Sequence, residues 1–221
     1  MTSLKTIKSS IMLLMAAMFI TLASGCGKGD SEKAKADATP ADSATAQEKP
    51  QFKISDSNVP YDKNSAFIVI SKKDLTLTVF ARSNGDTIAL ATYPVCVGKN
   101  KGNKEKGGDM RTPESPAGEP FTITDIQDAS TWAHDFGDGR GSILAYGNWF
   151  LRLKTPFSGI GIHGSTNNEN SVPGRASEGC IRLRDQDIIT LKENYARVGM
   201  PVIIKGEEQG LLPFEEKCLL K

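Results

Sequence analysis

The sequence predicts a mostly β domain, either a sandwich or an open barrel, with one clear helix in its C-terminal half. Two observations support this fold class. Short apolar runs bounded by Gly and Pro recur between residues 66 and 164, and such runs are typical of strands separated by turns. Only residues 185–199 show a helical spacing of apolar side chains, and one more strand-like run, PVIIK at 201–205, follows them.

The first runs are expected to form hairpins. Residues 66–80 divide into two strands around a Lys-Lys-Asp turn, and apolar residues alternate with Thr in the second strand, which is the period of a half-buried strand. The residues NGD at 84–86 predict a second turn. Four β-rich runs then continue the pattern: residues 87–98, 120–126, 142–153 and 159–164.

The helix is predicted from its ends as well as from its spacing. Asp185 stands in a capping position, and Gly199 followed by Pro201 ends the helix. Four apolar residues are expected to share one stripe of its surface: Ile188, Leu191, Tyr195 and Val198.

The N-terminal residues resemble an export signal. Lys5 and Lys8 precede an apolar run at 11–23, which is too short to span a membrane comfortably as a permanent helix. The small residues of LASGC then lead to Cys26, as in a lipoprotein signal. We therefore expect a lipoprotein signal peptide at 1–25 and a lipid on Cys26. Ordinary secretion with cleavage elsewhere, or an uncleaved anchor, is the alternative.

Composition divides the rest of the chain. Residues 26–63 are rich in Lys, Asp, Glu, Ala, Ser and Pro, so we expect the lipidated Cys26 to be followed by a disordered tether. A catalytic domain is expected at 64–206 and a C-terminal tail at 207–221. This organisation predicts a bacterial cell-envelope protein that is held on a membrane by its N-terminal lipid, with the domain in the periplasm or outside the cytoplasmic membrane.

Charge gives no reason to expect a nucleic-acid partner. Without residues 1–25 the chain has 25 basic and 26 acidic residues. The basic stretch at 99–111 is interrupted by glycines, so we interpret it as a solvated loop rather than as a binding surface.

The cysteines leave at least one thiol free or paired with another chain. With Cys26 lipidated, three remain, and three is an odd number. Cys96 lies in a strand-like run and is expected to be buried, and Cys218 could pair with it. No CxxC or closely spaced His/Cys set is present, so we expect neither a metal nor another cofactor.

Cys180, in SEGCIRL, is either a nucleophile or a structural thiol. A cysteine nucleophile needs a base and donors for an oxyanion. His163 ends an apolar strand, where a base can be aimed, whereas His134 lies in a loop-like stretch that suggests a solvated or turn-capping role. Gly179 would let a reacting carbonyl approach the amide of Cys180. These facts alone leave both readings of Cys180 open.

The motifs around these residues resemble the L,D-transpeptidase catalytic domain family of the YkuD type. The resemblance starts from IHG at 162–164 followed by SEGCIRL at 177–183. GDMRTPESPAGEPFTI, the hairpin FIVISKKDLTLTVF and the helix-strand DIITLKENYARVGMPVII agree with other parts of the family pattern. Together they cover about residues 64–206 and imply an L,D-transpeptidase-like β fold.

The resemblance implies a cysteine acyl transfer on peptidoglycan stem peptides. Cys180 would attack the carbonyl of the third residue and expel D-alanine, and His163 would act as general base and acid. The carbonyl of Gly164 would orient His163, and the amides of Gly179 and Cys180 would bind the oxyanion. The residues assigned to substrate binding or to shaping the site are Ser177, Glu178 and Arg182. Arg182 would bind a substrate carboxylate or pair with Asp185 or Asp187.

One residue departs from the family pattern, because Glu178 stands where the family usually has histidine. An ionised carboxylate only accepts hydrogen bonds, so we expect Glu178 to adjust the site rather than to abolish its activity.

Three functions remain open. The thioester could be resolved by an amine of a second stem or of a wall-attached protein, which makes the chain a transpeptidase. Water would instead make it an L,D-carboxypeptidase or an endopeptidase. The third alternative is a wall-binding lipoprotein that keeps the fold without the activity.

Overall fold

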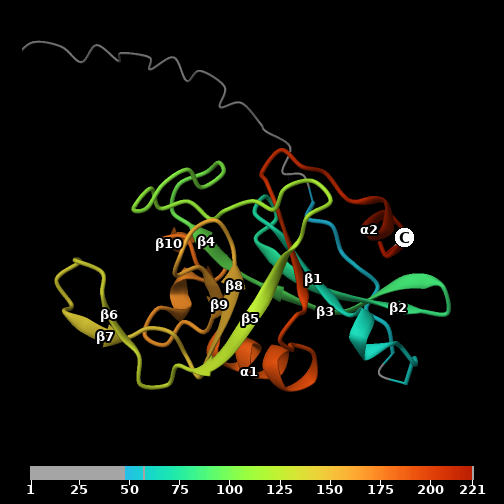
Figure 1. Ribbon diagram of the computed structural model, residues 1–221, viewed down its shortest axis with the longest axis horizontal. Coiled ribbons are helices and arrows are strands. Elements are labelled where there is room, and N and C mark those ends of the chain that lie inside the picture. Colours follow the sequence, from blue (N-terminus) through green and yellow to red (C-terminus); the bar gives the residue numbers. More distant parts are fainter. Residues whose placement is uncertain (1–47, 57, 221) are drawn as a thin grey trace, which may run out of the picture. The chain divides into compact units, whose positions relative to one another are not determined.

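The computed structural model describes residues 48–56 and 58–220, which belong to one unit spanning residues 47–221 (Figure 1). The signal peptide expected at 1–25, the lipidated Cys26 and the tether as far as residue 47 lie outside the described residues. Among the described residues, no helix is long and apolar enough to cross a membrane.

Ten strands form one mixed sheet, and the mostly β prediction is confirmed. The order across the sheet is β10-β4-β11-β9-β8-β5-β12-β1-β2-β3. The strands of this sheet are β1 (Phe67–Ser71), β2 (Thr76–Ser83), β3 (Asp86–Pro94), β4 (Cys96–Gly98), β5 (Phe121–Asp128), β8 (Trp149–Lys154), β9 (Gly161–His163), β10 (Gly174–Ser177), β11 (Ile181–Arg182) and β12 (Pro201–Lys205). The helices are η1 (Lys63–Ser65), η2 (Glu169–Ser171), α1 (Asp185–Asn194) and α2 (Pro213–Lys217).

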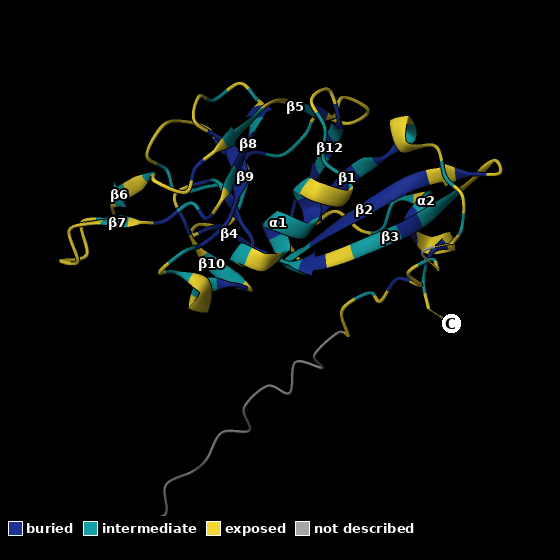
Figure 2. Cartoon of the chain, turned by 90° about the horizontal axis from the view of Figure 1, so that it is seen from below, coloured by how far each residue is buried: buried dark blue, intermediate teal, exposed yellow. Residues whose placement is uncertain are grey.

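Alternation of side chains gives the sheet a hydrophobic cluster on each face. In β1, Ile68 and Ile70 belong to the main core with Ile188 and Leu191 of α1, whereas Val69 belongs to a second cluster. Successive residues of a strand point to opposite faces, so an apolar run such as FIVI is buried on both sides. Figure 2 shows β2 largely buried in the same way.

Segments outside residues 64–206 complete the second cluster. Phe52 and Cys218 pack there with Phe80, and Phe52 forms a bridge with Leu219. The expected domain boundaries stay a prediction. These contacts nevertheless make residues on both sides of 64–206 part of the folded unit.

The helix α1 is shorter than the sequence predicts, and it begins differently. It ends at Asn194, so Val198 lies beyond it and is 61% exposed. Its N-cap residue is Arg184, which makes no side-chain capping bond. Asp185 is the first helical residue, and its carboxylate accepts hydrogen bonds from Ser165 and Thr166 instead. The expectation that Asp185 caps the helix was therefore wrong.

A separate two-stranded hairpin was not expected. It consists of β6 (Ala133–Asp135) and β7 (Ser142–Leu144), so the predicted run 142–153 divides between this hairpin and β8. In Figure 1 the hairpin projects beyond β8 and β9, and Figure 2 shows its strands mostly exposed. We call residues 133–144 the flanking hairpin.

Candidate active site

Two short parallel strands position the expected catalytic residues. In the β9–β11 pair, Ile162 lies opposite Ile181 and His163 lies opposite Arg182. Both isoleucines are fully buried in the core. Because side chains alternate between faces, His163 and Arg182 point to the other face, and Cys180, two residues before Arg182, points there too.

The imidazole of His163 is buried and fixed. Its Nδ1 lies 2.6 Å from the carbonyl oxygen of Gly164. Its ring stacks on Phe150 at 5.5 Å and packs on Tyr146 at 4.8 Å. Burial lowers the pKa of His163 to about 3, and the nearby Arg182 acts in the same direction. The ring is therefore neutral near pH 7, with Nδ1 as the donor to Gly164 and Nε2 as an acceptor.

Only glycine fits at position 164, because a Cβ there would lie 2.5 Å from Oδ1 of Asp185 and 2.7 Å from Cα of Gly147. This close approach brings the peptide that follows His163 against the start of α1. The hydrogen bonds from Ser165 and Thr166 to Asp185 hold the same loop. The position of His163 thus depends on the first turn of the helix.

The turn before Cys180 is held by hydroxyl groups. Ser177 Oγ donates to the carbonyl of Cys180 at 2.6 Å and accepts from the amide of Gly179 at 3.1 Å. Ser177 is buried and its contacts brace the turn, and it also lines the pocket that holds Cys180. The amide of Gly179, expected in the oxyanion hole, is already engaged, which leaves the amide of Cys180 as the candidate donor.

Thr112 is a positioning residue that the sequence reasoning missed. Its hydroxyl donates to the carbonyl of Gly179 at 2.9 Å and accepts from the amide of Gly98 at 2.8 Å. Gly179 has φ +137°, and a Cβ there would lie 2.8 Å from the carbonyl oxygen of Arg111. Glycine is therefore required next to Cys180. Thr112, which supports this glycine, belongs to the segment GDMRTPESPAGEPFTI that agrees with the family pattern.

The thiol of Cys180 is protonated in the resting site. Its Sγ donates to the carbonyl of Gly159 at 3.2 Å. Burial raises the pKa of Cys180, while the positive charges of Arg182 and Lys104 lower it and the negative charge of Glu178 raises it. Cysteine and histidine are thus both neutral before substrate binds.

Cys180 and His163 line one pocket of about 230 Å³. Its wall comes from the loop after β4, the flanking hairpin with the segment that follows it, the loop before β9 and the turn before β11. Besides the two catalytic candidates, its charged and aromatic lining residues are Lys104, His134, Phe136, Tyr146, Glu178 and Arg182.

Arg182 is a buried cation without an acidic partner among the described residues. It is 5% exposed, and its guanidinium lies 5.0 Å from the ring of Phe136. The alternative ion pair with Asp185 or Asp187 is not formed, because Asp185 binds Ser165 and Thr166 and Asp187 has no ion-pair partner in the described part of the chain. Arg182 is therefore available to a carboxylate that enters the pocket.

The interpretation of 99–111 as a solvated loop was wrong for Lys104. This residue is 7% exposed, and its Nζ lies 2.7 Å from Oδ1 of Asp109. Desolvation raises the pKa of Asp109, but its hydrogen bonds with Lys104 and three backbone amides outweigh that effect and hold the pKa below its usual range. The fully buried Lys72 anchors the loop through the carbonyls of Gly102 and Thr112.

The second histidine of the chain also lines the pocket. Nε2 of His134 lies 3.4 Å from Oε2 of Glu178. His134 is carried by β6 and packs on Phe136 at 4.5 Å. From the sequence, His134 is expected to have a solvated or turn-capping role. Its polar, glycine-rich surroundings gave no sign of a strand facing the site.

Cys96, Cys180 and Cys218 are free thiols. Cys96 is buried in β4, and Cys218 donates to the carbonyl of Thr87 on β3. In the described part of the chain, no group of three or more His, Cys, Asp or Glu side chains is placed to hold a metal ion.

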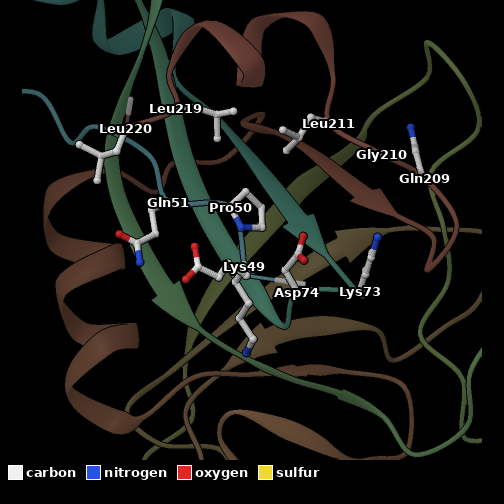
Figure 3. A pocket seen from close by; sticks show the side chains of 11 residues that line it. Lys49, Pro50, Gln51, Lys73, Asp74, Gln209, Gly210, Leu211, Leu219 and Leu220 are labelled. Atoms are coloured by element: carbon white, nitrogen blue, oxygen red, sulfur yellow. The ribbon is translucent and has the colours of Figure 1, made fainter. Parts of the chain in front are cut away.

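A larger hollow of about 660 Å³ lies between the two ends of the folded unit (Figure 3). Its lining includes Pro50, Gln51 and Asp74 together with leucines of the C-terminal segment, and it shares no residue with the Cys180 pocket. No cysteine or histidine lines it, so cysteine chemistry belongs to the smaller pocket.

A protonated cysteine directly before β11 and a neutral, oriented histidine on the neighbouring strand β9 are the parts that cysteine nucleophilic catalysis requires. A family model described as the L,D-transpeptidase catalytic domain, YkuD, matches residues 65–204. The chain therefore belongs to the L,D-transpeptidase catalytic domain family. A search of curated proteins found no match.

Solved structures similar to this chain include members of the same family. Bd1075 from Bdellovibrio bacteriovorus is 21% identical over 71% of this chain and 52% of that one, with a TM-score of 0.46. An L,D-transpeptidase from Mycobacterium smegmatis is 21% identical over 64% of this chain and 59% of its own, with a TM-score of 0.44. The helical cell shape determining protein Pgp2 from Campylobacter jejuni is 20% identical over 74% of this chain and 56% of its own, with a TM-score of 0.48. The chain thus spans between half and three fifths of these proteins.

Proposed function

We propose that the protein is a peptidoglycan L,D-transpeptidase that uses Cys180 for acyl transfer. The observation that carries this proposal is the pairing of β9 with β11, with Cys180 and the buried, neutral His163 in one pocket. Family membership supports the same chemistry. The donor is a stem peptide that ends in D-alanine after its third residue.

In the proposed acylation step, Cys180 Sγ attacks the carbonyl carbon of the third residue. Nε2 of His163 takes the thiol proton and then gives it to the leaving amine of D-alanine. The Nδ1 contact with Gly164 keeps Nε2 as the acceptor without the help of a carboxylate. The amide of Cys180 binds the oxyanion, which stabilises it by a few kcal/mol, as in other such sites.

Arg182 binds the carboxylate of the departing D-alanine. A buried guanidinium that faces only an aromatic ring costs desolvation energy, and a planar carboxylate can satisfy it with two parallel hydrogen bonds. Arg182 lies opposite His163 in the strand register. The carboxylate would therefore bind close to the base that protonates the leaving amine.

An amine resolves the thioester and gives a 3→3 cross-link or an attachment of a protein or another amine to the wall. Hydrolysis by water is the alternative outcome of the same intermediate, and the carboxylate of Glu178 in the pocket is compatible with it.

The protein would work at the envelope from a lipid on Cys26 and a flexible tether. Support comes from the sequence alone: a short apolar segment, small residues before Cys26 and a polar linker. The mass of the N-terminal peptide from membrane-extracted protein tests the lipid. An unmodified Cys26 would contradict it.

Incubating the full chain with a tetrapeptide-stem muropeptide tests the reaction. Transfer gives dimers with loss of D-alanine, whereas hydrolysis gives monomeric tripeptides, and mass spectrometry separates the two. Replacing His163 by Gln should lower the rate by roughly 10²–10⁴-fold. Activity that survives in the Cys180→Ala protein would overturn the assignment of the nucleophile.

A further inference from the structure

The charges around Cys180 are unevenly matched. Of the described residues that line the pocket, Glu178 alone is acidic, whereas Lys104 and Arg182 are basic. Lys104 is already neutralised by Asp109, and Arg182 faces the ring of Phe136. The carboxylate of Glu178 is thus the one lining group with which a cationic ligand can pair.

Glu178 is available for such a ligand. Its side chain is 48% exposed, and its Oε2 lies 3.4 Å from Nε2 of His134. This separation is long for a hydrogen bond, so the contact is weak and the carboxylate oxygens keep their capacity to accept from a ligand. His134 holds the carboxylate from the flanking hairpin without saturating it.

Glu178 and His134 lie on the side of the pocket where His163 acts. The ring of Tyr146 packs on both histidines, at 6.4 Å from His134 and 4.8 Å from His163. Burial raises the pKa of Tyr146, and a negative charge on the Cys180 thiolate or on Glu178 raises it further. A group bound by Glu178 would therefore lie near both the thiol and the base.

This side of the pocket is where the acyl acceptor has to enter. The base that protonates the leaving amine must also deprotonate the incoming nucleophile, because the second half of the transfer is the reverse of the first. A primary amine is an ammonium ion near pH 7, so a carboxylate beside the thioester attracts it and water gains nothing from that charge.

We propose that Glu178, positioned by His134, selects a cationic primary amine as the acyl acceptor; this inference rests on the proposed transpeptidase function. The ammonium binds to the carboxylate and releases one proton to solvent. The neutral amine nitrogen then bonds to the thioester carbonyl carbon, and the carbon–sulfur bond breaks. A second proton passes from nitrogen through His163 to Sγ, which leaves an amide and the free thiol of Cys180.

A competition experiment isolates this selection from acylation. The full-length protein receives a tetrapeptide-stem muropeptide with equal concentrations of glycinamide, which is largely an ammonium near pH 7, and hydroxylamine, which is neutral there. Both acceptors resolve the same acyl-enzyme, so the ratio of the two products reports acceptor choice whatever the rate of acylation. Mass spectrometry measures the ratio for the wild type, Glu178→Gln and His134→Gln.

We expect Glu178→Gln to lower the glycinamide-to-hydroxylamine ratio by about three- to fivefold, the upper part of the range for one half-exposed charge contact. His134→Gln should lower the ratio less, and the double variant should not fall below Glu178→Gln, because His134 acts through Glu178. Glu193→Gln, on the exposed side of α1, is the matched control and should keep the wild-type ratio.

The outcomes separate the two proposals. A wild-type protein that forms no acyl-enzyme and releases no D-alanine overturns both the proposed function and this inference. An acyl-enzyme whose product ratio stays within about twofold of wild type in Glu178→Gln overturns the role of Glu178 alone. Equal losses in Glu178→Gln and Glu193→Gln would also overturn that role.

Discussion

Replacing Thr112 by Val tests whether the turn before Cys180 depends on one hydroxyl group. Valine has nearly the same shape, but it leaves the amide of Gly98 and the carbonyl of Gly179 without their hydrogen bonds. Thr112 is 1% exposed. A Cβ on Gly98 would lie 2.6 Å from the carbonyl oxygen of Met110, so a replacement water has little room. Each buried group left unpaired costs about 1–3 kcal/mol, so the two together should lower the free energy of unfolding by about 2–6 kcal/mol.

Urea unfolding of the wild type, Thr112→Val and Thr112→Ser measures this effect. The serine variant keeps the hydroxyl and loses one methyl group, for a cost of about 1 kcal/mol. The muropeptide assay should show a rate that is lower by about tenfold or more in Thr112→Val, because the Gly179–Cys180 turn is no longer fixed. A valine variant as stable and as active as the serine variant would refute the bracing role of Thr112.

Three further predictions concern buried charges. Lys205→Met should lower the free energy of unfolding in urea by about 3–5 kcal/mol, because Glu215 is left buried without its partner at 2.6 Å. Adding Glu215→Leu should restore most of this stability. Additive losses of stability in the double variant would contradict this. Lys72→Met should lower the free energy of unfolding by about 3 kcal/mol. It should also lower the transfer rate, because Lys72 anchors the loop that carries Lys104. An unchanged transfer rate would contradict this link between the loop and the site. Since burial lowers the pKa of His163 from 6.5 to about 3, the unfolded chain binds a proton that the folded chain does not. The free energy of unfolding should therefore fall by a few kcal/mol as the pH drops from about 6.5 to about 3, and His163→Gln should lack this part of the slope in pH-dependent urea titrations.

The parts of the fold that the sequence predicts are those where side-chain alternation is strong. The run FIVIS in β1 and the Thr-containing β2 have a clear period of two, and Asn84 and Gly85 supply the positive φ of the turn. The strands β9 and β11, which carry or adjoin the candidate catalytic residues, share this property. Ile162 and Ile181 lie in the core, whereas His163, Cys180 and Arg182 line the pocket.

The missed features depend on tertiary contacts. The flanking hairpin is polar, exposed and rich in glycine, so its strands have no apolar period, and His134 consequently looked like a loop residue. Lys104 lies in a basic, glycine-interrupted loop, and only the three-dimensional contact with Asp109 and the anchor at Lys72 show that it is buried. Aspartate is a residue type that often caps helices, which is why Asp185 was expected to do so. Because Gly164 approaches closely, the carboxylate of Asp185 instead accepts hydrogen bonds from Ser165 and Thr166.

The resting charges of the site explain how a buried cysteine can be both protected and reactive under the proposed mechanism. Burial raises the pKa of Cys180 and lowers that of His163, so a thiolate–imidazolium pair is unfavourable in the empty pocket. Arg182 lowers the pKa of both groups, which helps the thiolate and opposes the imidazolium. A substrate carboxylate on Arg182 would weaken both effects as the carbonyl arrives, and the negative charge would then pass from sulfur to the oxyanion. Between turnovers the sulfur stays a thiol, the form that is slow to oxidise.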